Sequence, residues 1–323
     1  MPRASCKQTP IEYLQRVISL IQRHALNSGD VEWEIVRDTC LKMADSAESP
    51  SDTYAAIKYV LQELKDGHSF LVPAKGVRMP SSRTQASSIQ KKRRAPRRRA
   101  ALLDSIGYIP IPTASAAKGK ASLISYAQNI RRTIASFANA GADRWIFDLR
   151  ANGGGSMWPM LAAVGPVLGP GIVGYFESTR LSVPWYYESG VAGIETARGR
   201  RKLCSVDDSI PDFGAEQPVA IIMDNATASS AEALAIAFKG RANTAYFGHP
   251  TAGLSTCNDE LRLPDGAKLY LTVAVDADRN RNLYAAGLTP DFRVTELASK
   301  DVCLQSAVNW LSRTNIDESM RIR

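Results

Sequence analysis

A serine lies where a predicted strand gives way to a predicted helix. Residues 219–223 form a short apolar run rich in branched side chains, which predicts a buried strand. Ser229 and Glu232 follow with the spacing of a capping box, which predicts a helix that begins there and ends at Gly240. Helix N-termini favour negative charge, so a hydroxyl here could attack an acyl group whose oxyanion the backbone would hold. The alternative is that Ser229 only caps the helix.

A histidine could supply the base that a serine nucleophile needs. The chain contains only three histidines: His24, His68 and His249. A neutral imidazole suits proton transfer near neutral pH. His68 lies at the end of a predicted helix, in the stretch Asp66–Ser69, whereas His24 lies within the first predicted helix and is expected at the surface. His249 follows a predicted strand and is the competing candidate.

Three consecutive glycines offer a second source of oxyanion donors. Gly153–Gly155 follow the predicted strand at 144–150 after two intervening residues. A backbone without Cβ atoms can approach a ligand closely, so one of these N–H groups could bind the developing charge. The alternative interpretation is an ordinary turn between a strand and a helix.

Five short stretches, taken in order and spacing, resemble the motifs of the carboxyl-terminal processing proteases, the tail-specific serine peptidases and their tricorn-type relatives. They are Asp66–Ser69, Asp148–Gly155, Asn225–Glu232, Gly248–Gly253 and Gly287–Asp291. The resemblance covers residues 54–72 and 102–292, and it implies a crotonase-like (ClpP-like) α/β superhelical core with endopeptidase activity and no cofactor or metal. It also implies that Ser229 is the nucleophile and that the oxyanion hole consists of the N–H of Ser230 and one N–H from Gly153 to Gly155, of which Gly153 and Gly154 are our candidates.

The chain differs from this family at the position of the general base, the residue that would accept the proton of the serine. The Ser/Lys branch has a lysine at the position where this chain has Leu254, whose side chain cannot take a proton. Tricorn-type relatives use a histidine from the Asp-x-His region, which corresponds to His68. The resemblance therefore implies a Ser229–His68 pair, with His249 as the alternative base.

A second departure concerns the acid that would orient the histidine. Tricorn-type relatives have a glutamate where this chain has Tyr284. Asp278 is our candidate for the role, and Asp66 and Glu232 are alternatives that we expect to cap a turn and a helix instead. Met157 and Trp158 could line an apolar substrate pocket, or they could belong to the ordinary core.

The hydrophobic pattern predicts three parts. Residues 1–72 form a small helical unit that carries His68, with helices over about 11–25, 31–44 and 54–64. Residues 73–101 form a basic flexible linker, which is too short for the peptide-gripping PDZ domain that most processing proteases carry there. Residues 102–323 alternate between strands and helices, and this order predicts an α/β catalytic core with a mainly parallel sheet.

Composition limits the other classes of function. The net charge is +8, but the run from Lys91 to Arg99 supplies seven positive charges, so the remainder is nearly neutral. That run could bind nucleic acid, but without interleaved aromatic residues a solvated loop is the better interpretation. Five scattered cysteines argue against a zinc site or a disulfide framework. The first ten residues lack an apolar signal core, which predicts a cytoplasmic protein, although family relatives are often exported.

Three functions are therefore compatible with the sequence. The first is a serine peptidase acting on a peptide or protein substrate, with Ser229 as nucleophile and His68 as general base. The second is another acyl-transfer hydrolase on the same scaffold, such as an esterase or a small-peptide processing enzyme. The third is a peptide-binding relative that has lost its base and its acid. No apolar run is long enough to span a membrane.

Overall fold

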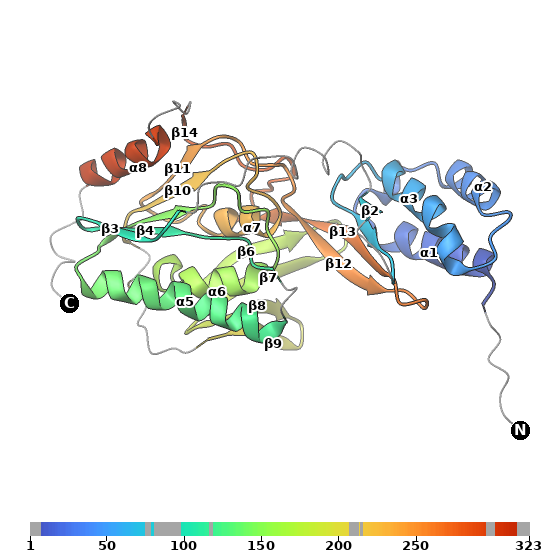
Figure 1. Cartoon of the computed structure of the whole chain (residues 1–323), viewed down its shortest axis with the longest axis horizontal. Coiled ribbons are helices and arrows are strands. Elements are labelled where there is room, and N and C mark those ends of the chain that lie inside the picture. Colours follow the sequence, from blue (N-terminus) through green and yellow to red (C-terminus); the bar gives the residue numbers. More distant parts are fainter. Residues whose placement is uncertain are drawn as a thin grey trace, which may run out of the picture. The chain divides into compact units, whose positions relative to one another are not determined.

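The chain divides into two compact units, which we describe separately (Figure 1). The computed structural model describes residues 8–74, 79–80, 98–115, 119–206, 213, 216–294 and 301–314. The first unit contains Met1–Arg93 together with Thr256–Ala274, and the second contains Arg94–Ser255 together with Val275–Arg323. The sequence placed residues 256–274 in the catalytic core, whereas in the structure they pack with the N-terminal helices.

The first unit begins with three helices that surround a small apolar core. They are α1 (Pro10–His24), α2 (Trp33–Met43) and α3 (Tyr54–Glu63), and the short 3-10 helices Ser28–Asp30 and Pro50–Thr53 lie between them. Helix α1 begins at a capping box formed by Thr9 and Glu12. Apolar residues three and four apart, among them Leu14, Ile18 and Ile21, are fully buried. The three predicted helices are therefore present with nearly the expected bounds.

A hairpin from late in the sequence completes this core. Its strands are β12 (Thr256–Arg262) and β13 (Lys268–Ala277), and β13 also pairs with β1 (Phe70–Val72), which pairs with β2 (Met79–Pro80). Leu269 and Leu271 of β13 pack in the helical cluster. The turn between β12 and β13 is anchored by Asp265, which accepts hydrogen bonds from the hydroxyls of Tyr13 (2.9 Å) and Tyr54. Met79 and Pro80, predicted as linker, are thus in a strand.

The second unit is built on a six-stranded sheet in the order β14-β11-β10-β5-β4-β3. The strands are β3 (Ala101–Leu103), β4 (Ile106–Pro110), β5 (Arg144–Asp148), β10 (Val219–Met223), β11 (Thr244–Gly248) and β14 (Phe292–Arg293). All neighbours are parallel except β3 and β4. Because β5, β10 and β11 are parallel neighbours, the loops that follow them leave the same edge of the sheet.

Helices cover both faces of this sheet, as Figure 1 shows. They are α5 (Lys120–Asn139), α6 (Met157–Leu168) and α7 (Ser230–Ala237) on one face and α8 (Val302–Arg313) on the other. Successive side chains of a strand point to opposite faces, so Trp145 and Phe147 pack toward α5, α6 and α7, while Ile146 packs toward α8. This double burial explains why the parallel strands are continuous apolar runs in the sequence.

An antiparallel meander also belongs to the second unit. Its strands are β6 (Gly171–Glu177), β7 (Ser182–Glu188), β8 (Val191–Thr196) and β9 (Gly199–Ser205). The two-residue turn between β7 and β8 has positive φ at both Ser189 and Gly190, which suits a tight hairpin. The prediction of a mainly parallel core is therefore right for the central sheet and wrong for this part, because short hairpin connections allow only antiparallel pairing.

The rest of the predicted linker lies outside the described residues apart from its two ends. Arg98 is described, and its guanidinium forms an ion pair with Asp148. No helix in the described ranges is both long and apolar enough to cross a membrane.

Candidate active site

Ser229 occupies a strained turn between β10 and α7. Its backbone has φ of 55° and ψ of −124°, a conformation that residues with side chains rarely adopt. The turn is fixed by Asp224, whose carboxylate accepts hydrogen bonds from the N–H groups of Ala226 (2.9 Å) and Thr227 (3.0 Å). A strained serine between a strand and a helix is the geometry of a nucleophile elbow, which exposes the hydroxyl to substrate.

The side chain of Glu232 stabilises this turn through hydrogen bonds. Its buried carboxylate accepts four hydrogen bonds: from the N–H of Ser229 (2.8 Å), the N–H of Gly253 (2.9 Å), the N–H of Leu254 (2.8 Å) and the hydroxyl of Thr251 (2.5 Å). Burial raises the pKa of Glu232, and these hydrogen bonds oppose the rise. Glu232 therefore serves as the helix cap that the sequence predicted, and it joins the serine turn to the loop that carries Leu254.

The glycine loop lies directly against the serine turn. A Cβ atom added to Gly154 would be 2.9 Å from Cβ of Ser229 and 3.0 Å from N of Ser230, and the hydroxyl of Ser230 donates to the carbonyl of Gly155 (2.8 Å). The structure thus brings together Ser229, Ser230 and the three glycines that the sequence singled out.

The N–H groups of this loop differ in their partners. Gly153 donates to the hydroxyl of Thr113 (3.0 Å), and Gly154 donates to the side-chain oxygen of Asn152 (2.9 Å). The N–H groups of Gly155 and Ser230 donate to no acceptor in the part of the chain that the structure describes. Within the described residues, neither of these two N–H groups has a hydrogen bond that an anion would have to replace.

Replacing Gly154 by alanine should reduce hydrolysis strongly. Gly154 has φ of 95°, and the new Cβ atom would also be 2.7 Å from the carbonyl oxygen of Ala228. The loop must move away from Ser229, and a displacement of that size at a reacting centre costs about 10²-fold in rate. Initial rates with a peptide substrate measure the effect.

Gly153→Ala is the matched control for this variant. A Cβ atom on Gly153 has nothing within 4 Å, and its φ is not in the left-handed region. Its rate should stay within about threefold of the wild-type rate, a change that corresponds to less than ~1 kcal/mol. Equal losses in the two variants would contradict a role in hydrolysis for the close approach of Gly154 to Ser229.

His68 is held rigidly in the first unit. The chain turns after α3 at Lys65 and Gly67, both with positive φ, and Oδ1 of Asp66 accepts hydrogen bonds from the N–H groups of His68 (2.9 Å) and Ser69 (2.8 Å). Nδ1 of His68 lies 2.7 Å from the hydroxyl oxygen of Thr256 on β12, and only 5% of the residue is exposed. Asp66 is therefore a turn cap, as predicted, and Thr256 fixes the imidazole ring.

Thr256 is a residue that the sequence analysis missed. It is 188 positions away from His68, and it reaches the ring because β12 and β13 join the N-terminal unit. No local pattern in the sequence signals that pairing.

Asp278, the sequence candidate for the orienting acid, has other partners in the structure. Its carboxylate accepts hydrogen bonds from the N–H groups of Asn280 (2.8 Å) and Asn282 (3.0 Å), the amide of Asn282 (2.9 Å) and the hydroxyl of Tyr284 (2.9 Å). Burial would raise the pKa of Asp278, but these hydrogen bonds lower it below its usual value. Asp278 thus holds the tight turn in which it lies.

The remaining sequence candidates have the following positions. His249 is half-buried just after β11, where its N–H donates to the carbonyl of Met223 (3.1 Å), and His24 is exposed in the last turn of α1, as predicted. Met157 is buried in the main core. Trp158 is half-buried, with its ring edge-on to Phe176. Trp158 is therefore the better candidate of the two for contact with a substrate.

The described ranges contain no group of three or more His, Cys, Asp or Glu side chains placed to hold a metal ion.

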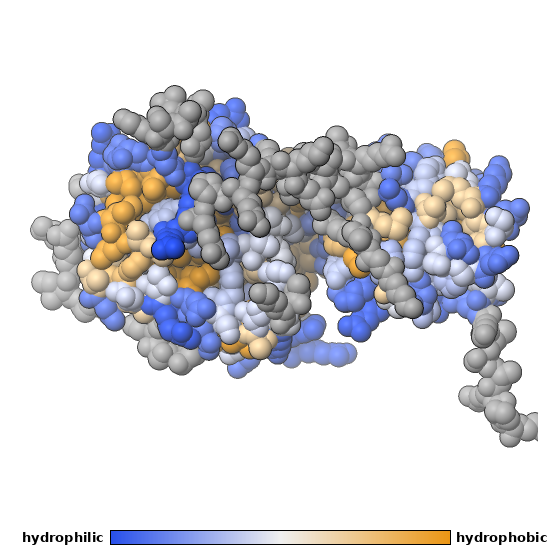
Figure 2. Space-filling view, viewed as in Figure 1, coloured by the Kyte–Doolittle hydropathy of each residue, from blue (hydrophilic) through white to orange (hydrophobic). Residues whose placement is uncertain are grey.

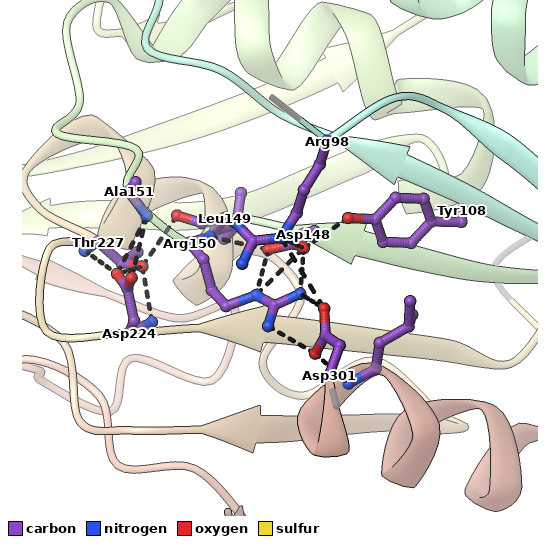
Figure 3. A network of polar contacts seen from close by, with 10 residues as sticks. Arg98, Tyr108, Asp148, Leu149, Arg150, Ala151, Asp224, Thr227 and Asp301 are labelled. Atoms are coloured by element: carbon purple, nitrogen blue, oxygen red, sulfur yellow. Dashed lines mark hydrogen bonds and ion pairs between the residues drawn. The ribbon is translucent and has the colours of Figure 1, made fainter. Parts of the chain in front are cut away.

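A charge network centred on the buried pair Asp148 and Arg150 lies beside the glycine loop and the serine turn (Figure 3). Arg150, the second residue after β5, forms hydrogen-bonded ion pairs with Asp148 at the end of β5 (2.7 Å) and with Asp301 at the start of α8 (2.8 Å). Asp148 also accepts a hydrogen bond from the hydroxyl of Tyr108 (2.7 Å) and an ion pair from Arg98 (3.3 Å). Asp148 and Arg150 are buried, whereas the side chains of Arg98 and Asp301 are 23% and 35% exposed, and the balance of two carboxylates and two guanidinium groups offsets the cost of the buried pair.

A strained serine at the start of a helix, followed by a backbone N–H group that donates no hydrogen bond within the described residues, is typical of the serine hydrolase class. The sequence profile of Peptidase family S41 matches residues 105–294, which is more than half of the chain. The chain belongs to this family and is a serine-type peptidase. The resemblance inferred from five motifs is therefore confirmed.

Two known proteins align with more than half of the chain. The nisin-resistance protein of Lactococcus lactis subsp. lactis is 24% identical over 305 residues, which cover 94% of this chain and 87% of that protein. The chloroplastic carboxyl-terminal-processing peptidase 2 of Arabidopsis thaliana is 25% identical over 197 residues, which cover 61% of this chain and 33% of that protein. The chain thus matches about a third of the length of this processing peptidase.

Solved structures share the fold. A lipoprotein from Streptococcus agalactiae superposes with a TM-score of 0.70 at 22% identity, over 97% of this chain and 99% of that one. The photosystem II D1 C-terminal processing protease superposes with a TM-score of 0.58 at 15% identity, over 88% of this chain and 93% of that one. The mixed α/β architecture is therefore that of S41 peptidases.

Proposed function

We propose that this peptidase cleaves peptide bonds through an acyl-enzyme formed on Ser229, with His68 as the general base. The observation that carries the proposal is the strained conformation of Ser229 at the mouth of α7, beside the N–H group of Ser230. The Ser229 hydroxyl attacks the scissile carbonyl while its proton passes to His68, which then protonates the leaving amine. Water, activated by the same imidazole, hydrolyses the acyl ester.

Thr256 would take the place of the carboxylate found in a Ser-His-Asp triad. If Nδ1–H of His68 donates to the Thr256 hydroxyl, the ring is held in the tautomer in which Nε2 accepts the proton. A hydroxyl orients the ring but stabilises an imidazolium less than a carboxylate would, because it carries no charge. This arrangement supports a Ser229–His68 pair that is assisted by a neutral hydroxyl. It gives Asp278 no part in the reaction.

The N–H of Ser230 and one N–H of the glycine loop would hold the oxyanion. Gly153 and Gly154 were assigned this role from the sequence, but the N–H of each already donates to a side chain. Use of either group requires Thr113 or Asn152 to release it, whereas Gly155 requires no such exchange. We therefore favour Ser230 and Gly155, with Gly154 supplying the close approach of the loop to the serine.

The substrate that we propose is a peptide or protein segment, with Trp158 as a candidate contact. A relative is named a nisin-resistance protein, so nisin is one compound to test. A crotonase-like superhelical core remains our description of the catalytic unit. The cytoplasmic location expected from the N-terminal residues also remains a prediction, and one structural relative is titled a lipoprotein.

A fluorophosphonate probe tests this proposal directly, because it reacts only with an activated serine. The wild-type chain should be labelled at Ser229, and prior heating of the protein should prevent labelling. A peptide library and matched ester substrates then separate a peptidase from an esterase by their relative kcat/KM values. Absence of labelling and of hydrolysis in the folded wild-type chain would overturn the assignment and favour a peptide-binding role.

A further inference from the structure

Helix α8 is attached at its start to Arg150, two residues after strand β5, and at its end to β5 itself. At its start, Asp301 binds the guanidinium of Arg150 through two hydrogen bonds of 2.8 Å, Nη1 to Oδ1 and Nη2 to Oδ2. At its end, the carbonyl of Leu311 accepts a hydrogen bond from Nε of Arg144 (3.1 Å), the first residue of β5. The two attachments differ in one respect: only the first lies at the edge of the sheet from which the glycine loop leaves.

Arg150 lies between two residues that contact the serine turn, as Figure 3 shows. On one side, the carbonyl of Leu149 accepts a hydrogen bond from the hydroxyl of Thr227 (3.0 Å). On the other, the N–H of Ala151 donates to the carboxylate of Asp224 (3.1 Å). The backbone around Arg150 is thus attached to the turn that presents Ser229, and a shift of Arg150 would move both attachments.

The guanidinium of Arg150 is held from two directions. Its Nε and Nη2 bind the carboxylate of Asp148 at 3.0 Å and 2.7 Å, and its other side faces Asp301, while the side chain is only 5% exposed. Two bidentate carboxylate contacts fix a planar guanidinium in position and orientation. Asp148 is part of the strand itself, so Asp301 is the partner that comes from a separate element.

We propose that Asp301, and through it helix α8, positions the glycine loop and the serine turn for the peptidase reaction. This inference rests on the proposed roles of Ser229 and of the N–H groups beside it. Asp301 touches neither substrate nor nucleophile; it fixes Arg150, and Arg150 fixes the backbone from Leu149 to Ala151. Small displacements of oxyanion donors lower the rate of the chemical step more than they lower substrate binding.

The test is the substitution Asp301→Asn. Asp301 also caps α8, because its Oδ1 accepts the N–H of Leu304 (3.0 Å), and asparagine retains a capping oxygen. The variant therefore removes the charge and one acceptor from Arg150 while it keeps the helix cap. We expect kcat to fall between about 10- and 100-fold with KM within about twofold of wild type.

Arg144→Met is the matched control. It removes the attachment of α8 at the opposite end, and it should lower the melting temperature about as much as Asp301→Asn does. Because Arg144 lies at the start of β5, far along the strand from the glycine loop, kcat should not change. Equal kcat values for wild type and Asp301→Asn would overturn the proposal, and so would equal losses of kcat in the two variants.

Hydrogen exchange gives a readout that does not depend on activity. The N–H groups of Ala151, Gly153 and Gly154 are hydrogen-bonded, and they should exchange about tenfold faster in Asp301→Asn but at the wild-type rate in Arg144→Met. Unchanged exchange in Asp301→Asn would refute the positioning role even if the wild-type chain proved inactive. If the wild-type chain were inactive but exchange were faster in Asp301→Asn, the proposed function would be refuted. The link from Asp301 through Arg150 to the glycine loop would still be supported.

Discussion

Ser229→Ala is expected to lower kcat/KM for a peptide substrate by at least about 10³-fold and to abolish labelling by a fluorophosphonate. The expectation follows from the position of Ser229 at the mouth of α7, where its backbone has the strained conformation of a nucleophile elbow. The melting temperature should change by no more than about 3 °C, since alanine adds no atom to the turn. Progress curves, intact mass after labelling and a thermal unfolding scan provide the three measurements.

Ser230→Ala is the control for this variant. The proposed role of Ser230 uses its backbone N–H, which alanine retains, whereas its hydroxyl only donates to the carbonyl of Gly155. A loss of about tenfold or less is expected, the cost of one hydrogen bond. If Ser229→Ala hydrolysed the substrate at the wild-type rate, or if Ser230→Ala were the more damaging change, Ser229 would not be the nucleophile.

His68→Ala is expected to be nearly as damaging as Ser229→Ala, and the double variant should be no worse than either single one. Members of one catalytic unit are strongly non-additive, because the loss of the base already removes the benefit of the nucleophile. His249→Ala, which removes the other candidate base, should change the rate much less. A loss in His249→Ala that matched the loss in Ser229→Ala would transfer the role to His249.

The pH dependence of the wild-type rate gives a second test of His68. Protonated imidazole cannot accept the serine proton, so activity should be present at neutral pH and fall as the pH is lowered through the range in which imidazole binds a proton, about 6.5 for a free side chain. Thr256→Val should reduce kcat about tenfold without the loss of this acid limb, since it removes only the group that orients the ring. A rate that stayed constant down to pH 4 would exclude histidine as the base.

Elements whose signal is local in the sequence were predicted well. Three such signals each consist of residues that are close together in the sequence: the apolar run before Asp224, the capping box of Ser229 and Glu232, and the three glycines. The structure shows the strand, turn and loop that they indicate. The apolar periodicity of α1 and α3 likewise identified both helices. In these places the short-range pattern and the tertiary structure agree, which is typical of natural sequences.

Features that depend on distant partners were not predicted. The threonine that contacts His68 and the aspartate that holds Arg150 are separated from their partners by 188 and 151 positions. Asp278 was our candidate for the acid that would orient the histidine, but a carboxylate followed by Asn280 and Asn282 also suits a local turn, and the structure shows that use. Residue type alone does not distinguish a carboxylate that binds a catalytic histidine from one that accepts hydrogen bonds from the backbone of its own turn.

The β12–β13 hairpin has a consequence for the order in which the chain can fold during synthesis. The N-terminal helices lack part of their core until Leu263, Leu269 and Leu271 have been made, so this unit cannot be complete when residue 93 leaves the ribosome. The segment that contains Ser229 is translated before the strand that carries Thr256. We therefore expect that chains truncated before residue 256 never hold His68 in the orientation proposed for catalysis, and that proteolytic activity begins only after the β12–β13 hairpin has been translated.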